Sequence, residues 1–150
     1  MTNIGILTCS NSTQDVGCSS FGCLNAAYDR EGTFAQYPEG VRIKGIINCA
    51  GCPGLRGHDK ILKRVRALVA SGVEAIHLGA CMVMGCPFVA KYEKAINQAY
   101  PDLKVVRGTH AAPPAELADL LMQKLTDRLV AQGETVPEIA MTARKALNID

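Results

Sequence analysis

The feature that most limits the possible folds is a fourfold alternation of short apolar segments with amphipathic ones. The apolar segments are rich in Ile and Val and are bounded by Gly and Pro, as buried parallel strands tend to be. We expect strands over residues 3–8, 41–48, 74–78 and 103–107. Because repeated β-α-β units impose right-handed crossovers, the pattern predicts an α/β fold. Its doubly wound, four-stranded parallel sheet would have the order 2-1-3-4, flavodoxin-like or Rossmann-like, with flanking helices.

The segments between and after these strands show the 3.6-residue period of helices. We expect helices over residues 21–31 and 59–71, and a further helix opened by Pro87. No linker, repeat or low-complexity segment interrupts the chain. Residues 1–150 are therefore predicted to form a single domain, in which residues 113–150 are C-terminal helices.

The composition indicates a globular protein that can fold without disulfide bonds. The chain has 150 residues, 48% hydrophobic and 20% charged, which is enough to bury a core. The formal net charge of +2 is too small to indicate nucleic acid as a partner. Its one basic run is expected to be the solvated face of a helix, and it consists of Lys60, Lys63, Arg64 and Arg66.

The chain shows no sign of export or membrane insertion. Its most apolar stretch, residues 75–90, is interrupted by His77, Gly79, Gly85 and Pro87 and cannot span a bilayer. We therefore expect a cytoplasmic protein with no membrane partner and with an unknown redox or small-molecule partner. In a reducing compartment, seven cysteines indicate metal binding or catalysis more often than disulfides.

All the cysteines fall where the first three predicted strands end. Loops from the carboxyl ends of parallel strands converge at one edge of the sheet, where such folds bind ligands. Soft thiolate ligands select zinc, copper(I) or iron–sulfur clusters, whereas the alternative is that the cysteines act as small buried hydrophobes. In chain order they are Cys9, Cys18 and Cys23, then Cys49 and Cys52, then Cys81 and Cys86.

Two other features refine this site. Cys49 and Cys52 form a C-x-x-C pair, which can chelate one metal or form a short redox disulfide. His110 follows the fourth strand and is a candidate ligand or hydrogen-bond partner. His77 lies inside the third strand, where a hydrogen-bonded core histidine is the commoner interpretation and a partner of the ligands is the alternative. Both histidines are kept as cofactor-binding candidates.

Known phosphate-binding patterns do not account for these residues. An arginine six positions after a cysteine, as in C-x5-R phosphatase loops, is missing after Cys9, Cys49 and Cys81. Neither a G-K-[ST] phosphate loop nor a G-x-G-x-x-G motif is present, so nucleotide binding has little support.

Several short motifs between Asn3 and His110 resemble those of the CGGC-domain family, small prokaryotic proteins described as metal binders. The resemblance implies a site rich in cysteine and histidine. In the name motif, Ala50 replaces the first glycine, which adds a methyl group but removes no ligand. The matching segments are Gly5 to Cys9, the pair Cys18 and Cys23, Cys49 to Gly54, Ile76 to Cys81, Cys86-Pro87 and Gly108 to His110.

These observations favour a metal centre whose ligand core is Cys9, Cys49, Cys52 and Cys81. Cys18, Cys23 and Cys86 are further candidate metal ligands. The sulfur-rich set and the presence of a single C-x-x-C pair favour an iron–sulfur cluster over zinc. A redox, sensing or sulfur-chemistry role would suit such a centre. The alternative is a metal-free dithiol oxidoreductase or redox sensor that uses Cys49 and Cys52.

Overall fold

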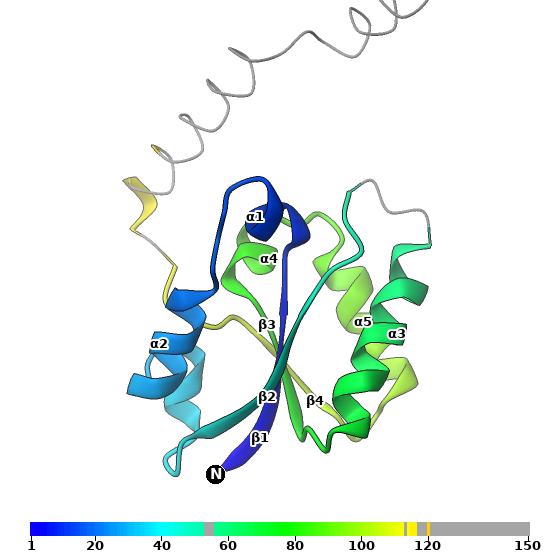
Figure 1. Cartoon of the computed structure of the whole chain (residues 1–150), viewed down its shortest axis with the longest axis horizontal. Coiled ribbons are helices and arrows are strands. Elements are labelled where there is room, and N and C mark those ends of the chain that lie inside the picture. The colour runs from blue at the N-terminus through cyan, green and yellow to red at the C-terminus, as the bar shows by residue number, and fades with distance from the viewer. Residues whose placement is uncertain (53–55, 113, 117–119, 121–150) are drawn as a thin grey trace, which may run out of the picture. The chain divides into compact units, whose positions relative to one another are not determined.

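A parallel four-stranded sheet organises the chain, as seen in a computed structural model that describes residues 1–52, 56–112, 114–116 and 120 (Figure 1). The order of the strands is β2-β1-β3-β4, and all neighbouring strands are parallel. The predicted α/β class and strand order are therefore confirmed. The strands are β1 (Thr2–Thr8), β2 (Val41–Asn48), β3 (Ala75–Leu78) and β4 (Lys104–Arg107).

Helices connect the strands, and the contacts within the chain divide it into the two units Met1–Ala112 and Pro113–Asp150. All elements named here belong to the first unit. The helices predicted over residues 113–150 fall almost wholly outside the described residues, so they and the single domain remain predictions. The helices are α1 (Ser10–Gln14), α2 (Phe21–Asp29), the 3-10 helix η1 (Gly32–Gln36), α3 (Gly57–Ala70), α4 (Ala80–Gly85) and α5 (Val89–Ala99).

Helices cover both faces of the sheet (Figure 1), and a hydrophobic cluster lies on each face. On the face covered by α3 and α5, called the α3/α5 side below, Leu7, Val65 and Ile96 are fully buried. On the face covered by α2 and η1, called the α2 side, Ile4 and Phe34 are fully buried. The period-2 alternation of β1 thus sends successive side chains to opposite clusters.

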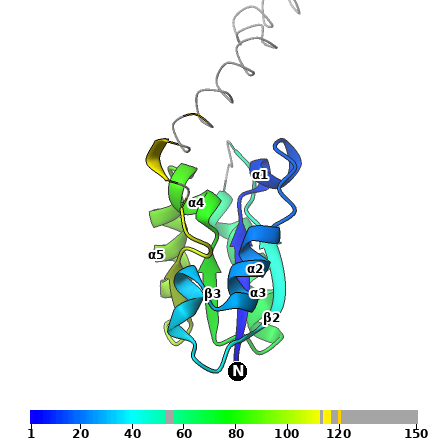
Figure 2. The same ribbon diagram turned by 90° about the vertical axis from the view of Figure 1, so that its left-hand side faces the viewer.

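Three short helical elements were not predicted. Helix α1 follows β1, helix α4 follows β3, and η1 precedes β2. They contain only five or six residues, which is too short for a hydrophobic period to appear in the sequence. Figure 2 shows α1 and α4 at the same end of the sheet, beyond the carboxyl ends of the strands. None of the described helices is long and apolar enough to cross a membrane.

Candidate metal centre

Three cysteines reach the carboxyl edge of the sheet from three neighbouring strands. Cys9 directly follows β1 and precedes the first residue of α1. Cys49 directly follows β2, and Cys81 lies in the first turn of α4, after β3. The structure therefore brings these sequence-predicted residues to one edge.

Two consecutive backbone amides hold two of the sulfurs. The Cys9 N–H donates a hydrogen bond to Sγ of Cys81, and the Ser10 N–H donates to Sγ of Cys49, each over 3.2 Å. The Ser10 hydroxyl also donates to the Cys49 carbonyl oxygen over 3.1 Å. The start of α1 therefore connects the cysteine that follows β2 with the cysteine that follows β3. Because these donors belong to the backbone, they orient the sulfurs whatever side chains flank them.

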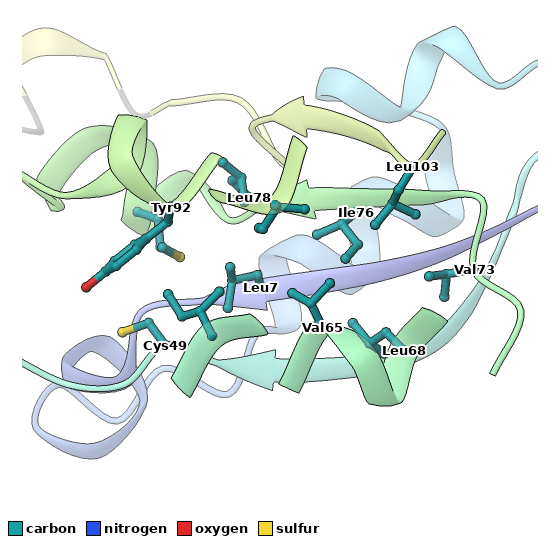
Figure 3. Close-up of a cluster of buried hydrophobic side chains, with 12 residues drawn as sticks. Leu7, Cys49, Val65, Leu68, Val73, Ile76, Leu78, Tyr92 and Leu103 are labelled. Atoms are coloured by element: carbon teal, nitrogen blue, oxygen red, sulfur yellow. The ribbon is translucent and has the colours of Figure 1, made fainter. Parts of the chain in front are cut away.

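The cysteines differ in their exposure to solvent. Cys49 is only 5% exposed, and Figure 3 shows it beside Leu7 at the same end of the cluster as Tyr92. Cys9, Cys81 and Cys86 are partly buried, whereas Cys18 and Cys52 are exposed. The two members of the C-x-x-C pair thus lie in different surroundings, one in the core and one at the surface.

The pKa of the Cys81 thiol is raised above its usual value. Burial is the largest cause, and the Cys9 N–H and the Ser12 side chain oppose it by stabilising the thiolate. Negative charge on Cys9 or Cys23 raises the pKa of Cys81 further. Cys81 is therefore close enough to both residues for their charges to act on it.

A similar coupling includes the remaining cysteines. Burial raises the pKa of Cys86, and charges on Cys49, Cys52 and Cys9 raise it as well. Burial likewise raises the pKa of Cys23, and the charge of Cys18 adds to that rise. Charge on Cys9 thus acts on both Cys81 and Cys86, so the cysteines after β1 and β3 lie near one another.

Thr109 connects the Cys23 thiol to the rest of this edge. Its hydroxyl lies 3.2 Å from Sγ of Cys23 and accepts a hydrogen bond from the Ala80 N–H at the start of α4. Thr109 is completely buried. Cys18 is positioned more locally, since its sulfur accepts a hydrogen bond from the Ser20 N–H over 3.4 Å.

His77 is completely buried on the α2 side, and both of its ring nitrogens have partners within the protein. Nδ1 lies 3.0 Å from the Gly108 carbonyl oxygen, which can only accept, so this nitrogen carries the proton. Nε2 then accepts a hydrogen bond from the Tyr37 hydroxyl over 3.0 Å. Burial lowers the pKa of His77, which keeps the ring neutral. This geometry suits a hydrogen-bonded core histidine that anchors the chain just before Thr109.

His110 is placed at the beginning of α2. A β-carbon added at Gly22 would lie 3.2 Å from Cδ2 of the His110 ring, so the ring packs against backbone that carries no side chain. Its Nδ1 lies 2.9 Å from the Ala111 carbonyl oxygen, which makes Nδ1 the donor and leaves Nε2 as the atom available for a ligand. The loop after β4 therefore supplies one histidine near the helix that carries Cys23.

Comparison with known proteins gives the family of the chain. A family model described as the CGGC domain matches residues 3–110. The chain belongs to the CGGC-domain family. No curated protein and no solved structure matched it. Membership of the CGGC-domain family suggests a metal-binding role.

The substitution in the name motif of this CGGC domain has a simple structural explanation. Gly51 adopts a φ of +84°, a conformation that favours glycine, whereas Ala50 is not among the residues with positive φ. The turn between Cys49 and Cys52 therefore depends on the second glycine of the motif. Alanine at the first position introduces no backbone strain.

Sequence reasoning missed three residues of the CGGC domain that contact or adjoin the cysteines. Ser10 and Thr109 supply the contacts described above, and Tyr92 lies close enough to Cys86, Cys49 and Cys52 for their charges to raise its pKa in addition to burial. In the sequence, Ser10 is adjacent to Cys9 and Thr109 is adjacent to His110, and this adjacency could have indicated both as site residues. For Tyr92, the sequence pattern indicated only a buried position on an amphipathic helix, with no indication of the cysteines nearby.

The thiols of this CGGC domain are not joined to one another. All seven cysteines are free. Among the described residues, no three His, Cys, Asp or Glu side chains already stand in an arrangement that would hold a metal ion.

Proposed function

We propose that this chain binds a metal through thiolates at the carboxyl edge of the sheet. The observation that supports the proposal is that consecutive amides, those of Cys9 and Ser10, donate to Sγ of Cys81 and Sγ of Cys49, so that cysteines from three strand ends meet at one edge. Burial raises the pKa of the Cys81, Cys86 and Cys23 thiols, and negative charge on neighbouring cysteines raises it further. A cation bound among them would remove both penalties, because metals bind the deprotonated thiolate.

The ligand core of the proposed centre is Cys9, Cys49, Cys52 and Cys81. Two of these sulfurs already accept backbone N–H bonds, which is how proteins orient and tune metal thiolates. His110 keeps Nε2 available and is the histidine that would join the site. His77 would act indirectly, by holding the segment before Thr109 in place. Cys18, Cys23 and Cys86 are the further candidate ligands.

The metal that best suits this donor set is an iron–sulfur cluster, with zinc as the alternative. Four thiolates and few histidines are typical of cluster ligation, and amide N–H bonds to sulfur are among the factors that set cluster potentials. A cluster here would serve in electron transfer, redox sensing or sulfur chemistry, with a redox or small-molecule partner in the cytoplasm. When bound, it would supply an exchangeable electron, while the chain would supply orientation and a partly buried setting.

Elemental analysis of the full chain purified without oxygen tests this proposal. We expect iron and acid-labile sulfide in the protein and broad visible absorption that bleaches in air. A colourless preparation with about one zinc per chain, the stoichiometry of a tetrahedral site, would replace the cluster with zinc and keep the thiolate site. A preparation that contains neither metal, even after reconstitution with iron and sulfide or with zinc, would contradict metal binding.

Single serine replacements test the ligand assignment. We expect replacement of Cys9, Cys49, Cys52 or Cys81 to lower the metal content at least about tenfold, because each change removes a thiolate from the proposed core. Ser71→Ala is the control, since it removes a hydroxyl that donates to the Leu68 carbonyl oxygen at the end of α3 and touches no thiol. Full metal content in all four cysteine variants would refute the assignment.

One observation favours a second candidate function, a metal-free dithiol. Cys49 is buried and Cys52 is exposed, and both are free, an arrangement in which an exposed thiol can react and a buried thiol can resolve it. Such a protein would form a Cys49–Cys52 disulfide reversibly in redox buffers. Mass spectrometry of peptides from metal-free protein equilibrated with glutathione measures that disulfide directly. Its absence at every buffer potential would eliminate this function.

A further inference from the structure

A hollow of about 550 Å³ lies beside the C-x-x-C loop. It is lined by Ala50, which stands between Cys49 and Cys52, and by four residues of α3, namely Lys60, Lys63, Arg64 and Ala67. The volume falls within the range of small-molecule sites. The hollow therefore places three cationic side chains next to the exposed end of the proposed thiolate site.

The charges around this hollow lack an internal partner. Lys60, Lys63 and Arg64 are exposed, and none of them forms an ion pair with any residue that the structure describes. Asp59, the carboxylate one turn before Lys63, is held by Arg56 at 2.8 Å. Arg64 donates one hydrogen bond to the Lys60 carbonyl oxygen, and its remaining N–H groups are available to an anion.

A solvated helix face would explain a basic run alone, but the hollow beside Ala50 is an additional observation. A concave surface places three cations around a common volume, so that an anion inside it interacts with all of them at once. Arginine adds a planar fork that fits carboxylate and phosphate oxygens. The small residues Ala50 and Ala67 leave room for the body of the ligand.

We propose that this hollow binds a small molecule with carboxylate or phosphate groups and holds it beside Ala50, in the segment between Cys49 and Cys52. The anion site rests on the proposed function in one respect only. If the thiolate site exists, the anion is the class of small molecule that this site would sense or act on. Binding itself depends on the three cations and on Ala50. It is therefore measurable whether or not a metal is present.

Amide NMR of the full chain, titrated at low ionic strength with inorganic phosphate and separately with succinate, tests the proposal. We expect saturable shifts at Lys63 and Ala67 with at least one of these probes, and the stronger probe identifies the anionic group preferred. Neutral succinamide should produce no saturable shift. Added sodium chloride should weaken the binding, because it screens exposed charges.

Charge-neutralising variants complete the test. K60Q/K63Q/R64Q should raise the dissociation constant about tenfold, as expected for the loss of three exposed charge interactions. The control K91Q/K94Q removes two exposed cations from α5 and should bind like the wild type. If one substitution combination fails to fold, K63Q alone should still weaken binding measurably. Absence of saturable shifts, or equal weakening by the control, would overturn the proposal.

Metal content measured in the same samples separates this proposal from the previous one. A chain that binds anions at α3 but contains no metal after reconstitution would keep the anion site and reject the metal centre. A chain that contains metal but binds no anion would keep the metal centre and reject the anion site.

Discussion

The two sides of the sheet handle buried polar groups in opposite ways. On the α2 side, the buried His77 has protein partners for both ring nitrogens and remains neutral. Toward the α3/α5 side, Cys81 and Cys86 have thiols that burial and neighbouring charges make difficult to ionise. The engaged histidine therefore needs no further partner, whereas the buried thiols, including Cys23 of α2, would gain from a bound cation.

The sequence predicts both His77 and Cys81 as residues of the site, but their surroundings in the structure differ. His77 and Cys81 both belong to the segment Ile76 to Cys81, yet the histidine ring is hydrogen-bonded inside the core, and the cysteine sulfur accepts the Cys9 N–H bond at the carboxyl edge. A histidine whose two nitrogens are engaged cannot ligate a metal without breaking one of those contacts. Changes on the α2 side should therefore alter stability first, and changes at the carboxyl edge should alter metal binding first.

The largest effect is expected from His77→Ala. The change would leave the Tyr37 hydroxyl without its buried partner and the Gly108 carbonyl oxygen with the Thr33 hydroxyl alone. It would also open a cavity against Phe34, whose ring centroid lies 4.5 Å from that of His77. We expect a loss of about 4 kcal/mol in the free energy of unfolding, measured by urea denaturation.

The metal content of the folded fraction of this variant separates the two roles. Unchanged stoichiometry would agree with a structural histidine, while loss of metal from protein that remains folded would make His77 a ligand. Thr13→Ala provides a comparison for a residue whose hydroxyl donates to the Ser10 carbonyl oxygen over 2.9 Å at the carboxyl edge. It should cost about 2 kcal/mol, at about 1 kcal/mol for each hydrogen bond, because the Asn48 side-chain amide also donates to this hydroxyl over 3.2 Å.

Gly32→Ala should be the next most damaging change. Gly32 has a φ of +56°, and a β-carbon there would overlap the carbonyl oxygen of Thr109. Strain and displacement of the Thr109–His110 backbone should together cost about 3 kcal/mol in the free energy of unfolding. Gly17→Ala is the matched control, because Gly17 has a φ of +74° with no atom within 4 Å of the added carbon.

The Gly17 variant should lose only about 1 kcal/mol, the cost of the backbone conformation alone. Thermal or urea unfolding of both variants measures the difference. Equal losses would show that contact with Thr109 does not matter, and the α2 side would then not position the loop after β4.

The sequence predicted the sheet well because its information is local and periodic. The segment 41–48 was predicted with its observed bounds, and the other strands differ by one residue at one end. The convergence of Cys9, Cys49 and Cys81 followed from topology, since parallel strands end at one edge. The N–H bonds from Cys9 and Ser10 could not be predicted, because they depend on a helix of five residues that has no detectable period.

Ser10→Pro tests one of those unpredicted bonds and should have a smaller effect. Proline is tolerated at the first position of a helix, and the extended φ and ψ of Cys9 (−75° and 126°) suit a residue that precedes proline. The variant would lose the N–H that donates to Cys49 Sγ and also the hydroxyl. We expect metal affinity, measured by competition with a chelator, to fall about tenfold.

Ser10→Ala is the control for this change, since it removes the hydroxyl and keeps the N–H. It should alter metal affinity less than the proline variant. If both variants bind metal equally, the amide does not tune the site, and the carboxyl edge would hold its sulfurs by packing alone.

The smallest effects should appear in the pH dependence of metal-free protein, where the buried histidine and the buried thiols respond at opposite ends of the pH scale. Burial lowers the pKa of His77 from 6.5, so the unfolded chain binds more protons as the pH falls below 6.5, and stability should decrease there. Burial raises the pKa of Cys81 and Cys86 from 9.0, so the folded chain retains protons that the unfolded chain loses, and stability should decrease above pH 9.0. Urea midpoints across the pH range measure both losses.

Two substitutions separate the acid loss from the alkaline loss. His77→Gln should flatten the acid limb of the stability profile and leave the alkaline limb unchanged, because glutamine does not titrate. Cys81→Ser should reduce the alkaline loss and leave the acid limb unchanged, because serine does not titrate and Cys86 and Cys23 keep their share of the loss. Bound metal should also abolish the alkaline loss, since coordinated thiolates no longer carry protons at neutral pH. An alkaline loss that persists in the cysteine variant and in metal-loaded protein alike would place its origin outside the thiolate network.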